Sequence, residues 1–241
     1  MDIRTILLSL MTLIVVGIVV IIIYELTYGG GILVPSRIAP NKTSVELIGN
    51  LHDGREYLKL DQSLPPSQNE DEGLEYSYAC WIVINDYDDG ADVPVVFVKG
   101  AADLSMASPS VTLRRGKNEI HIHQDTYESK KPGRMVIHNL PAGKLIHLAV
   151  TVRQTSMDVY VNGFIYGHLT LSALPLQNAE SVYVAENGGW KGLIGNLIYY
   201  NYALTPDEVR SISQKKPQRD PDDIPPYPQY FDSSWWINHH S

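Results

Sequence analysis

The stretch Leu145–Thr170 constrains the fold more than any other part of the chain, because it reads as three consecutive β-strands. Apolar and polar residues alternate along it, as they do in a sheet with one buried face. Asn162-Gly163 separates the last two runs and favours a type I′ turn, since both central residues of that turn need positive φ. Together with the β-prone stretch Gly192–Val209, this pattern predicts a sandwich of two antiparallel sheets.

Short β-prone runs continue through the middle of the chain, each bounded by Gly, Pro or Asn, as in a sandwich or jelly roll. We expect Trp81, within the run Tyr76–Ile84, to be a large core anchor. Val45–Leu51 and Tyr57–Leu60 alternate around a His-Asp-Gly turn and form a candidate hairpin. The other predicted strands are Val93–Lys99, Val111–Leu113, Glu119–Gln124, Met135–Ile137, Ser181–Ala185 and Leu193–Tyr200.

One short helix is predicted after the last strand. Thr205, Pro206 and Glu208 match the N-cap, first and third positions of a helix, the pattern of a capping box with a proline in the first turn. We expect this helix to run to about Ser213. The segment that follows is Pro-rich and charged, which is typical of an extended polyproline II conformation.

An uncharged, mostly aliphatic run, Ile6–Tyr24, approaches the ~20 residues that span a bilayer. A secretory signal has a shorter apolar core and a small-residue cleavage site, so we favour an uncleaved anchor. Arg4 precedes the run and Glu25 follows it, and the positive-inside rule therefore predicts a cytoplasmic N-terminus. Asn41, in Asn-Lys-Thr, is a glycosylation candidate on the other side. The predicted anchor residues are Ile6, Leu10, Leu13, Val16, Val20 and Tyr24.

The composition of the chain restricts its possible functions further. The 241 residues carry a formal net charge of -8, which argues against a nucleic-acid partner. The single cysteine, Cys80, excludes an intrachain disulfide and lies in a strand pattern typical of a small core residue. We expect a transmembrane anchor over residues 1–28, a linker over 29–44, a sandwich over 45–213 and a Pro-rich aromatic tail over 214–241.

Several motifs, in this order, resemble a known family. HDGREYLKL, YSYACWIVIND and VFVKG are similar to the opening strands of laminin G-like domains of the concanavalin A-like lectin/glucanase superfamily. HLAVTV, MDVYVNG and GLIGNLIYYNYALTPDEV are similar to the closing strands and the helix that follows them. One position departs from the family pattern: the family commonly has a tryptophan just before the histidine of the HLAV strand, where this chain has Leu145-Ile146. The resemblance covers roughly residues 45–213 and implies a mainly β, two-sheet antiparallel jelly roll.

The arrangement of hydrophobic helix, sandwich and Pro-rich tail also resembles that of membrane-anchored laminin G-like proteins of large icosahedral DNA viruses of algae and protists. This resemblance implies a non-enzymatic structural or interaction protein, a minor capsid component in the internal membrane of a virion. Its implied partners are the lipid bilayer and other capsid or membrane proteins. A carbohydrate-binding attachment protein is the alternative, with glycans as partners, and a glycoside hydrolase is the least favoured.

The chain offers little for catalysis or metal binding. Hydrolases of this fold carry E-x-D-x-x-E on one strand, whereas the nearest stretch here, Glu119–Asp125, has histidines in place of the acids, so we expect no enzyme. His121 and His123 share a strand face without a recognisable third metal ligand. We expect no cofactor other than calcium, which oxygen-rich loops can hold. The weak calcium candidates are Asp86, Asp88, Asp89 and Asp92.

Aromatic residues supply two candidate binding surfaces. A sugar would need an exposed aromatic platform, for which Tyr87, Tyr127 and Trp190 are candidates. The tail combines proline with aromatic residue types that dominate binding hot spots, and two adjacent tryptophans are costly to leave in water. We therefore predict that the tail docks on a partner through Tyr227, Tyr230, Phe231, Trp235 and Trp236.

Overall fold

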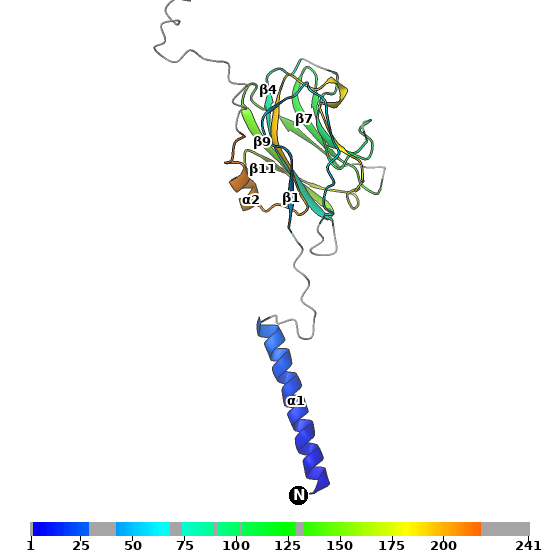
Figure 1. The fold of residues 1–241 in the computed structure, drawn as a ribbon, viewed down its shortest axis with the longest axis vertical. Coiled ribbons are helices and arrows are strands. Elements are labelled where there is room, and N and C mark those ends of the chain that lie inside the picture. The colour runs from blue at the N-terminus through cyan, green and yellow to red at the C-terminus, as the bar shows by residue number, and fades with distance from the viewer. Residues whose placement is uncertain are drawn as a thin grey trace, which may run out of the picture. The chain divides into compact units, whose positions relative to one another are not determined.

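The chain divides into two compact units, Met1–Asn41 and Lys42–Ser241. The first contains one helix and the second a β-sandwich (Figure 1). In the first helix the side chains are described as far as Tyr24. The computed structural model describes residues 2–28, 42–67, 74–88, 91–101, 103–128 and 133–217.

Helix α1 (Ile3–Tyr28) is apolar on all sides. Its segment Ile3–Tyr24 has a mean hydropathy of 3.3, and its side chains are not buried within the protein. The helix is long and apolar enough to cross a membrane, criteria that a signal sequence also meets. The predicted anchor residues all lie on it with exposed side chains, namely Ile6, Leu10, Leu13, Val16, Val20 and Tyr24.

The second unit consists of two antiparallel sheets, A and B. Sheet A is built from β1 (Ser44–Ile48), β2 (His52–Asp53), β4 (Glu75–Ile84), β9 (Leu145–Arg153), β10 (Ser156–Val161), β11 (Phe164–Thr170) and β13 (Gly192–Tyr200). Sheet B is built from β3 (Leu58–Leu60), β5 (Val95–Lys99), β6 (Ser110–Arg114), β7 (Lys117–Gln124), β8 (Gly133–His138) and β12 (Val182–Val184). A short 3-10 helix (Glu186–Gly188) and helix α2 (Pro206–Ile212) complete the unit.

The order of strands confirms the predicted fold class. Sheet A runs β1-β13-β4-β9-β10-β11, with β2 also paired to β13, and sheet B runs β3-β12-β5-β6-β7-β8. The two sheets pack face to face as a jelly-roll sandwich, and α2 lies against sheet A (Figure 1). β11 is an edge strand of sheet A and β8 is an edge strand of sheet B, and the two lie in contact on the same side of the sandwich.

Alternate residues of β4 divide between the core and the outer face of sheet A, because successive side chains of a strand point to opposite faces. Tyr76, Tyr78 and Cys80 belong to the core between the sheets. Trp81 faces outward instead, where its ring lies 5.1 Å from that of His147 and Nε1 donates to the Lys215 carbonyl at 3.0 Å. Trp81 is thus buried as predicted, at 4% exposed, but it lies outside the core between the two sheets. Among the described residues, Trp190, 1% exposed, is the tryptophan that belongs to the core between the sheets.

The predicted hairpin is confirmed. Asn162 and Gly163 have φ of 52° and 83°, as a two-residue type I′ turn requires. Val161 pairs with Phe164 directly across the turn. This tight reversal places β11 beside β10 and makes β11 the last strand of sheet A.

Helix α2 begins with the predicted capping box. The Thr205 hydroxyl accepts from the Glu208 amide at 3.3 Å, and the Glu208 carboxylate accepts from the Thr205 amide at 2.7 Å. The helix covers the outer face of sheet A through a small apolar cluster. The buried members of that cluster are Ala79, Ala149, Tyr160, Tyr200, Leu204 and Val209.

The hairpin expected between β1 and β3 is absent, because the two strands enter different sheets. β1 pairs with β13 in sheet A, whereas β3 pairs with β12 in sheet B. Between them, Gly54 packs so closely under Trp190 that a Cβ would lie 2.6 Å from the indole ring. The His-Asp-Gly sequence therefore carries the chain from one sheet to the other instead of reversing it.

Candidate functional site

A cavity of about 390 Å³ lies at the end of the sandwich where β5 ends and β6 and β12 begin. One wall is residues 61–67, which follow β3, and another is residues 177–181, which precede β12. The remaining lining residues come from the strands and from the loop before β6. They are Tyr76, Tyr78, Tyr199, Lys99 and Ser108.

Three tyrosines form the aromatic side of the cavity. The rings of Tyr78 and Tyr199 lie 5.1 Å apart, and those of Tyr76 and Tyr78 lie 6.2 Å apart. Burial raises the pKa of all three phenols, that of Tyr199 to about 12, so they stay neutral and can donate hydrogen bonds. The cavity therefore presents ring faces and neutral hydroxyl groups together.

The three hydroxyl groups differ in how they are satisfied. Tyr76 donates to Gln124 Oε1 at 2.7 Å and lies 3.1 Å from the Ser108 hydroxyl. Tyr199 donates to the Pro65 carbonyl at 3.0 Å. Tyr78, only 2% exposed, has no hydrogen-bond partner for its hydroxyl among the described residues. Because the Tyr78 side chain lines the cavity, its hydroxyl can form a hydrogen bond with a group that enters there.

Lys99 brings a positive charge to the rim. Its Nζ donates to the carbonyl and the side-chain Oδ1 of Asn178, both at 3.1 Å, and to the Glu180 carbonyl. Burial lowers the pKa of Lys99, while the Glu180 charge opposes that shift. These bonds hold the lysine against the loop before β12 and fix one edge of the opening.

Asp61 brings a negative charge to the same rim. Its carboxylate accepts from the Ser181 hydroxyl and pairs with Lys59 Nζ at 3.1 Å. The hydrogen bonds from Ser181 and Lys59 lower the pKa of Asp61, so it remains ionised. Asp61 is therefore suited to accepting hydrogen bonds and not to donating a proton.

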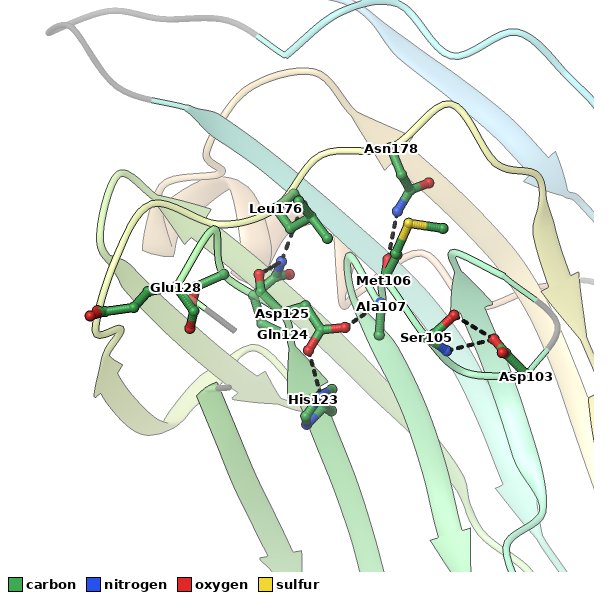
Figure 2. A network of polar contacts seen from close by, with 11 residues as sticks. Asp103, Ser105, Met106, Ala107, His123, Gln124, Asp125, Glu128, Leu176 and Asn178 are labelled. Carbon is green, nitrogen blue, oxygen red and sulfur yellow. Dashed lines mark hydrogen bonds and ion pairs between the residues drawn. The ribbon is translucent and has the colours of Figure 1, made fainter. Parts of the chain in front are cut away.

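A polar network that includes the lining residue Asn178 fixes the loop between β5 and β6 (Figure 2). The Asp125 carboxylate accepts from the Ala107 amide at 2.8 Å and lies 3.0 Å from His123 Nε2. The Asn178 side chain donates to the Met106 carbonyl at 2.6 Å, and the Ser108 hydroxyl donates to the Leu176 carbonyl. The same residues that close the loop thus position Ser108 beside Tyr76.

The candidate calcium residues lie elsewhere, in the loop after β4. Asp86 Oδ1 accepts from the Asp88 amide at 2.9 Å. Arg115 Nε donates to the Asp88 carbonyl at 3.1 Å and lies 3.9 Å from its carboxylate, so a cation already faces this loop. Asp92 accepts from the Arg115 amide through its carbonyl, and Asp89 lies outside the described residues. The described part of the chain holds no group of three His, Cys, Asp or Glu arranged to hold a metal ion.

The acidic and histidine residues of β7 pair with each other on the outer face of sheet B. His121 Nε2 lies 3.0 Å from the Glu119 carboxylate, and His138 Nδ1 lies 3.7 Å from it. The hydrogen bond with His121 lowers the pKa of Glu119. Neither Glu119 nor His121 lines the cavity.

The three candidate sugar-platform residues have different surroundings. Tyr127 is exposed at 63%, whereas Tyr87 is half-buried and donates to the Leu140 carbonyl. Trp190 is buried and donates to the Val83 carbonyl at 3.0 Å, so this candidate does not offer an exposed platform. None of these residues lines the cavity. The glycosylation candidate Asn41 and the docking residues Tyr227, Tyr230, Phe231, Trp235 and Trp236 lie outside the described residues.

One feature of the sequence does mark the cavity. Tyr76 and Tyr78 alternate in a run otherwise rich in aliphatic residues, which places two phenols on the buried face of one strand. Buried phenols need hydrogen-bond partners, so such a pair indicates a polar site within a core. The two loops that complete the cavity carry no comparable local signal.

Known structures share this fold. The botulinum neurotoxin serotype D ligand-binding domain, solved with N-acetylneuraminic acid, superposes with a TM-score of 0.53 at 11% identity, over 72% of this chain and 46% of that one. A mutant of HCR/D superposes with a TM-score of 0.54 at 10% identity, over 72% of this chain and 46% of that one. The receptor-binding domain of botulinum neurotoxin D superposes with a TM-score of 0.50 at 12% identity, over 72% of this chain and 43% of that one. This chain thus spans less than half the length of each.

No curated protein matches this sequence. The profile of the concanavalin A-like lectin/glucanases superfamily, in its laminin G form, matches residues 53–210. That range runs from β2 into α2 and includes every element that lines the cavity. The chain belongs to the concanavalin A-like lectin/glucanases superfamily.

Proposed function

We propose that the protein is a non-enzymatic, membrane-anchored, lectin-like binding module whose cavity takes a glycan. The observation that carries the proposal is the Tyr78 hydroxyl, which has no hydrogen-bond partner among the described residues and lines a cavity that also offers ring faces and charged or amide groups. Sugars combine apolar C–H faces with hydroxyl groups, and this lining can meet both. The volume of about 390 Å³ is at the lower end of the ~300–1,000 Å³ typical of ligand pockets, which fits one or two sugar rings.

The state of Asp61 argues against its acting as the acid of a hydrolase. Glycoside hydrolysis needs one carboxyl group whose pKa is raised so that it can protonate the leaving group. Asp61, at the rim, has its pKa lowered, and so does Glu119 on the outer face of sheet B. Both carboxylates therefore favour the ionised form.

The test is a glycan array probed with the full-length protein in detergent, with and without calcium. We expect saturable binding that Tyr78→Phe weakens by several-fold, since one hydrogen bond contributes ~0.5–1.5 kcal/mol. Tyr127→Phe, a matched change on an exposed ring outside the cavity, should leave binding unchanged. Absence of saturable binding would overturn the proposal. Binding that needs calcium and is lost in Asp88→Asn would move the site to the loop after β4.

A second candidate function is a structural tether within a virion, linking an internal membrane to the protein shell. The observation that supports it is the apolar helix α1, which is long enough to cross a membrane, and the role itself is the one implied by the resemblance stated in the sequence analysis. In this role the bilayer and capsid proteins are the partners, and the tail makes the protein contact. Truncation after Pro217, which retains the bond between Lys215 and Trp81, tests it. Loss of the protein from purified particles is expected, and unchanged incorporation would exclude a docking tail.

A further inference from the structure

β11 is an edge strand that carries exposed apolar side chains. It is the last strand of sheet A, so one side of its backbone is paired with no other strand among the described residues. Phe164, Ile165 and Tyr166 are 65%, 60% and 43% exposed. A free edge of this kind presents unpaired N–H and C=O groups that favour pairing with another strand.

The other edge strands of the sandwich are protected against such pairing. β1, at the opposite edge of sheet A, carries the charged residue Glu46. β3 has only three residues, one of them Lys59, and β8 carries Arg134. Short strands, charges and bulges are the usual devices that prevent edge-to-edge association.

β11 lacks these charges. Its sequence, FIYGHLT, contains no Asp, Glu, Lys, Arg or Pro, and its His168 is paired with Asp158 of β10. A bulge is present, but it faces β10, and regular pairing resumes from Gly167 to Thr170. The bulge turns Tyr166 toward β8, where its hydroxyl accepts from the His138 amide at 3.1 Å. Tyr166 thus contacts β8, and the Arg210 guanidinium lies 5.4 Å from the centroid of the Phe164 ring, whereas the edge from Gly167 to Thr170 has no paired strand on its outer side among the described residues.

The exposed area indicates what kind of partner fits. With ~150–250 Å² for each large side chain, the three exposed residues offer roughly 300 Å² per copy, and two copies roughly 600 Å². A stable interface in solution buries ~1,200–2,000 Å², so this patch needs a partner that is already held close. Anchoring in one membrane holds copies of the same chain at high effective concentration.

We propose that β11 pairs with β11 of a second copy in the same membrane, which joins two A sheets across a two-fold axis. The proposal rests on the membrane anchoring within the proposed function but not on glycan binding. Each chain has a formal net charge of -8, so copies repel one another in general, and an uncharged strand is where they can approach. Antiparallel pairing satisfies the backbone of both edges at once and shields the apolar patches of both copies.

The experiment uses purified full-length protein in phosphatidylcholine vesicles, in which no other protein is present. Thr170→Cys places a thiol at the end of β11, and Ser44→Cys places a matched thiol at the opposite edge of sheet A. Cys80 is 1% exposed and stays out of reach of a short bismaleimide. We expect a cross-linked product of twice the chain mass, several-fold more abundant for Thr170→Cys than for Ser44→Cys.

A second pair of variants tests the apolar patch. Ile165→Lys, added to Thr170→Cys, should abolish the cross-link, because it places a charge on each edge. Tyr57→Lys, at a residue 51% exposed and away from β11, should not. Because both sites are exposed, the thermal midpoint should change little, which checks the fold.

Flotation of the same vesicles distinguishes a failure of membrane anchoring from a failure of dimer formation. Protein that does not float lacks the anchor, and this result would overturn both the anchoring and the dimer. Protein that floats but cross-links no better than Ser44→Cys would overturn the dimer alone. A cross-link that survives Ile165→Lys would also overturn the pairing, since contact would then come from another surface.

Discussion

His147 lies on the outer face of sheet A, 2% exposed, with no hydrogen-bond partner for Nδ1 among the described residues. Burial lowers its pKa from the usual 6.5 to about 4. The folded protein therefore keeps this ring neutral at pH values where the unfolded chain has already bound a proton. The edge-on contact with Trp81, in which the ring centroids lie 5.1 Å apart, depends on that neutral ring staying buried.

This burial predicts a specific pH dependence of stability. Above about pH 6.5 the ring is neutral in both states, so its contribution is fully retained. As the pH falls toward about 4 only the unfolded state gains the proton, and stability should drop by on the order of 3 kcal/mol. Urea unfolding at pH 7 and pH 4 measures the drop. His147→Gln should flatten it and the exposed His168→Gln should not; equal slopes in both would contradict this role.

The cavity tyrosines should respond differently to loss of a hydroxyl group. Tyr76→Phe leaves the buried Gln124 without its donor, and we expect a loss of about 1–3 kcal/mol. Tyr78→Phe removes a hydroxyl that has no partner among the described residues, so stability should stay equal or rise. Chemical denaturation of both variants measures this difference. Similar losses would mean that the Tyr78 hydroxyl is already satisfied.

At the scale of elements, the β10–β11 hairpin and α2 support each other. A Cβ on Gly163 would overlap the Ser213 hydroxyl at the end of α2. Arg210 of α2 lies over the Phe164 ring, 5.4 Å from its centroid, in a cation–π contact. The turn that positions the edge strand β11 therefore also packs against the C-terminal helix α2.

Gly163→Ala should consequently cost more than backbone strain alone. Gly143→Ala is the matched control, because Gly143 also has positive φ, 67°, but a Cβ added there would meet nothing within 4 Å. We expect about 1 kcal/mol for the control and clearly more for Gly163→Ala, where helix and hairpin must separate. Thermal unfolding monitored by circular dichroism gives both values. Equal costs would show that the helix does not press on the turn.

At the scale of the whole molecule, the local parts of the fold were predictable from sequence and the long-range parts were not. The Asn162-Gly163 turn and the Thr205 cap depend on neighbouring residues, and both are as predicted. The pairing of β3 with β12 joins segments more than 100 residues apart, and no local pattern encodes it. The cavity depends on that pairing, since its two loop walls follow β3 and precede β12.

The outward direction of Trp81 was not predictable for a similar reason. Successive residues of a strand point to opposite faces of the sheet. In sheet A the outer face is covered too, by α2 and Lys215. Both faces of β4 are therefore buried, and an apolar residue fits either one. Sequence pattern alone cannot separate the two faces of such a strand.

Membrane anchoring by helix α1 can be tested in the intact chain. Leu13→Arg places a charge in the middle of α1 and should cost ~2.5–3.5 kcal/mol on insertion. We expect the native protein to resist alkaline carbonate extraction and the variant to be released, with Leu13→Ile as the conservative control. The intact mass should include residue Ile6 and the rest of α1. A mass lacking this helix would identify it as a cleaved signal.

Cys80 adds a property that concerns the environment of the whole chain. It is the only cysteine, it is 1% exposed, and burial raises its pKa to about 12, so its thiolate form is scarce. The sandwich therefore neither gains a cross-link under oxidising conditions nor loses one under reducing conditions. Its folding should be indifferent to redox potential, and the same structure can form on either side of the membrane that α1 is able to cross.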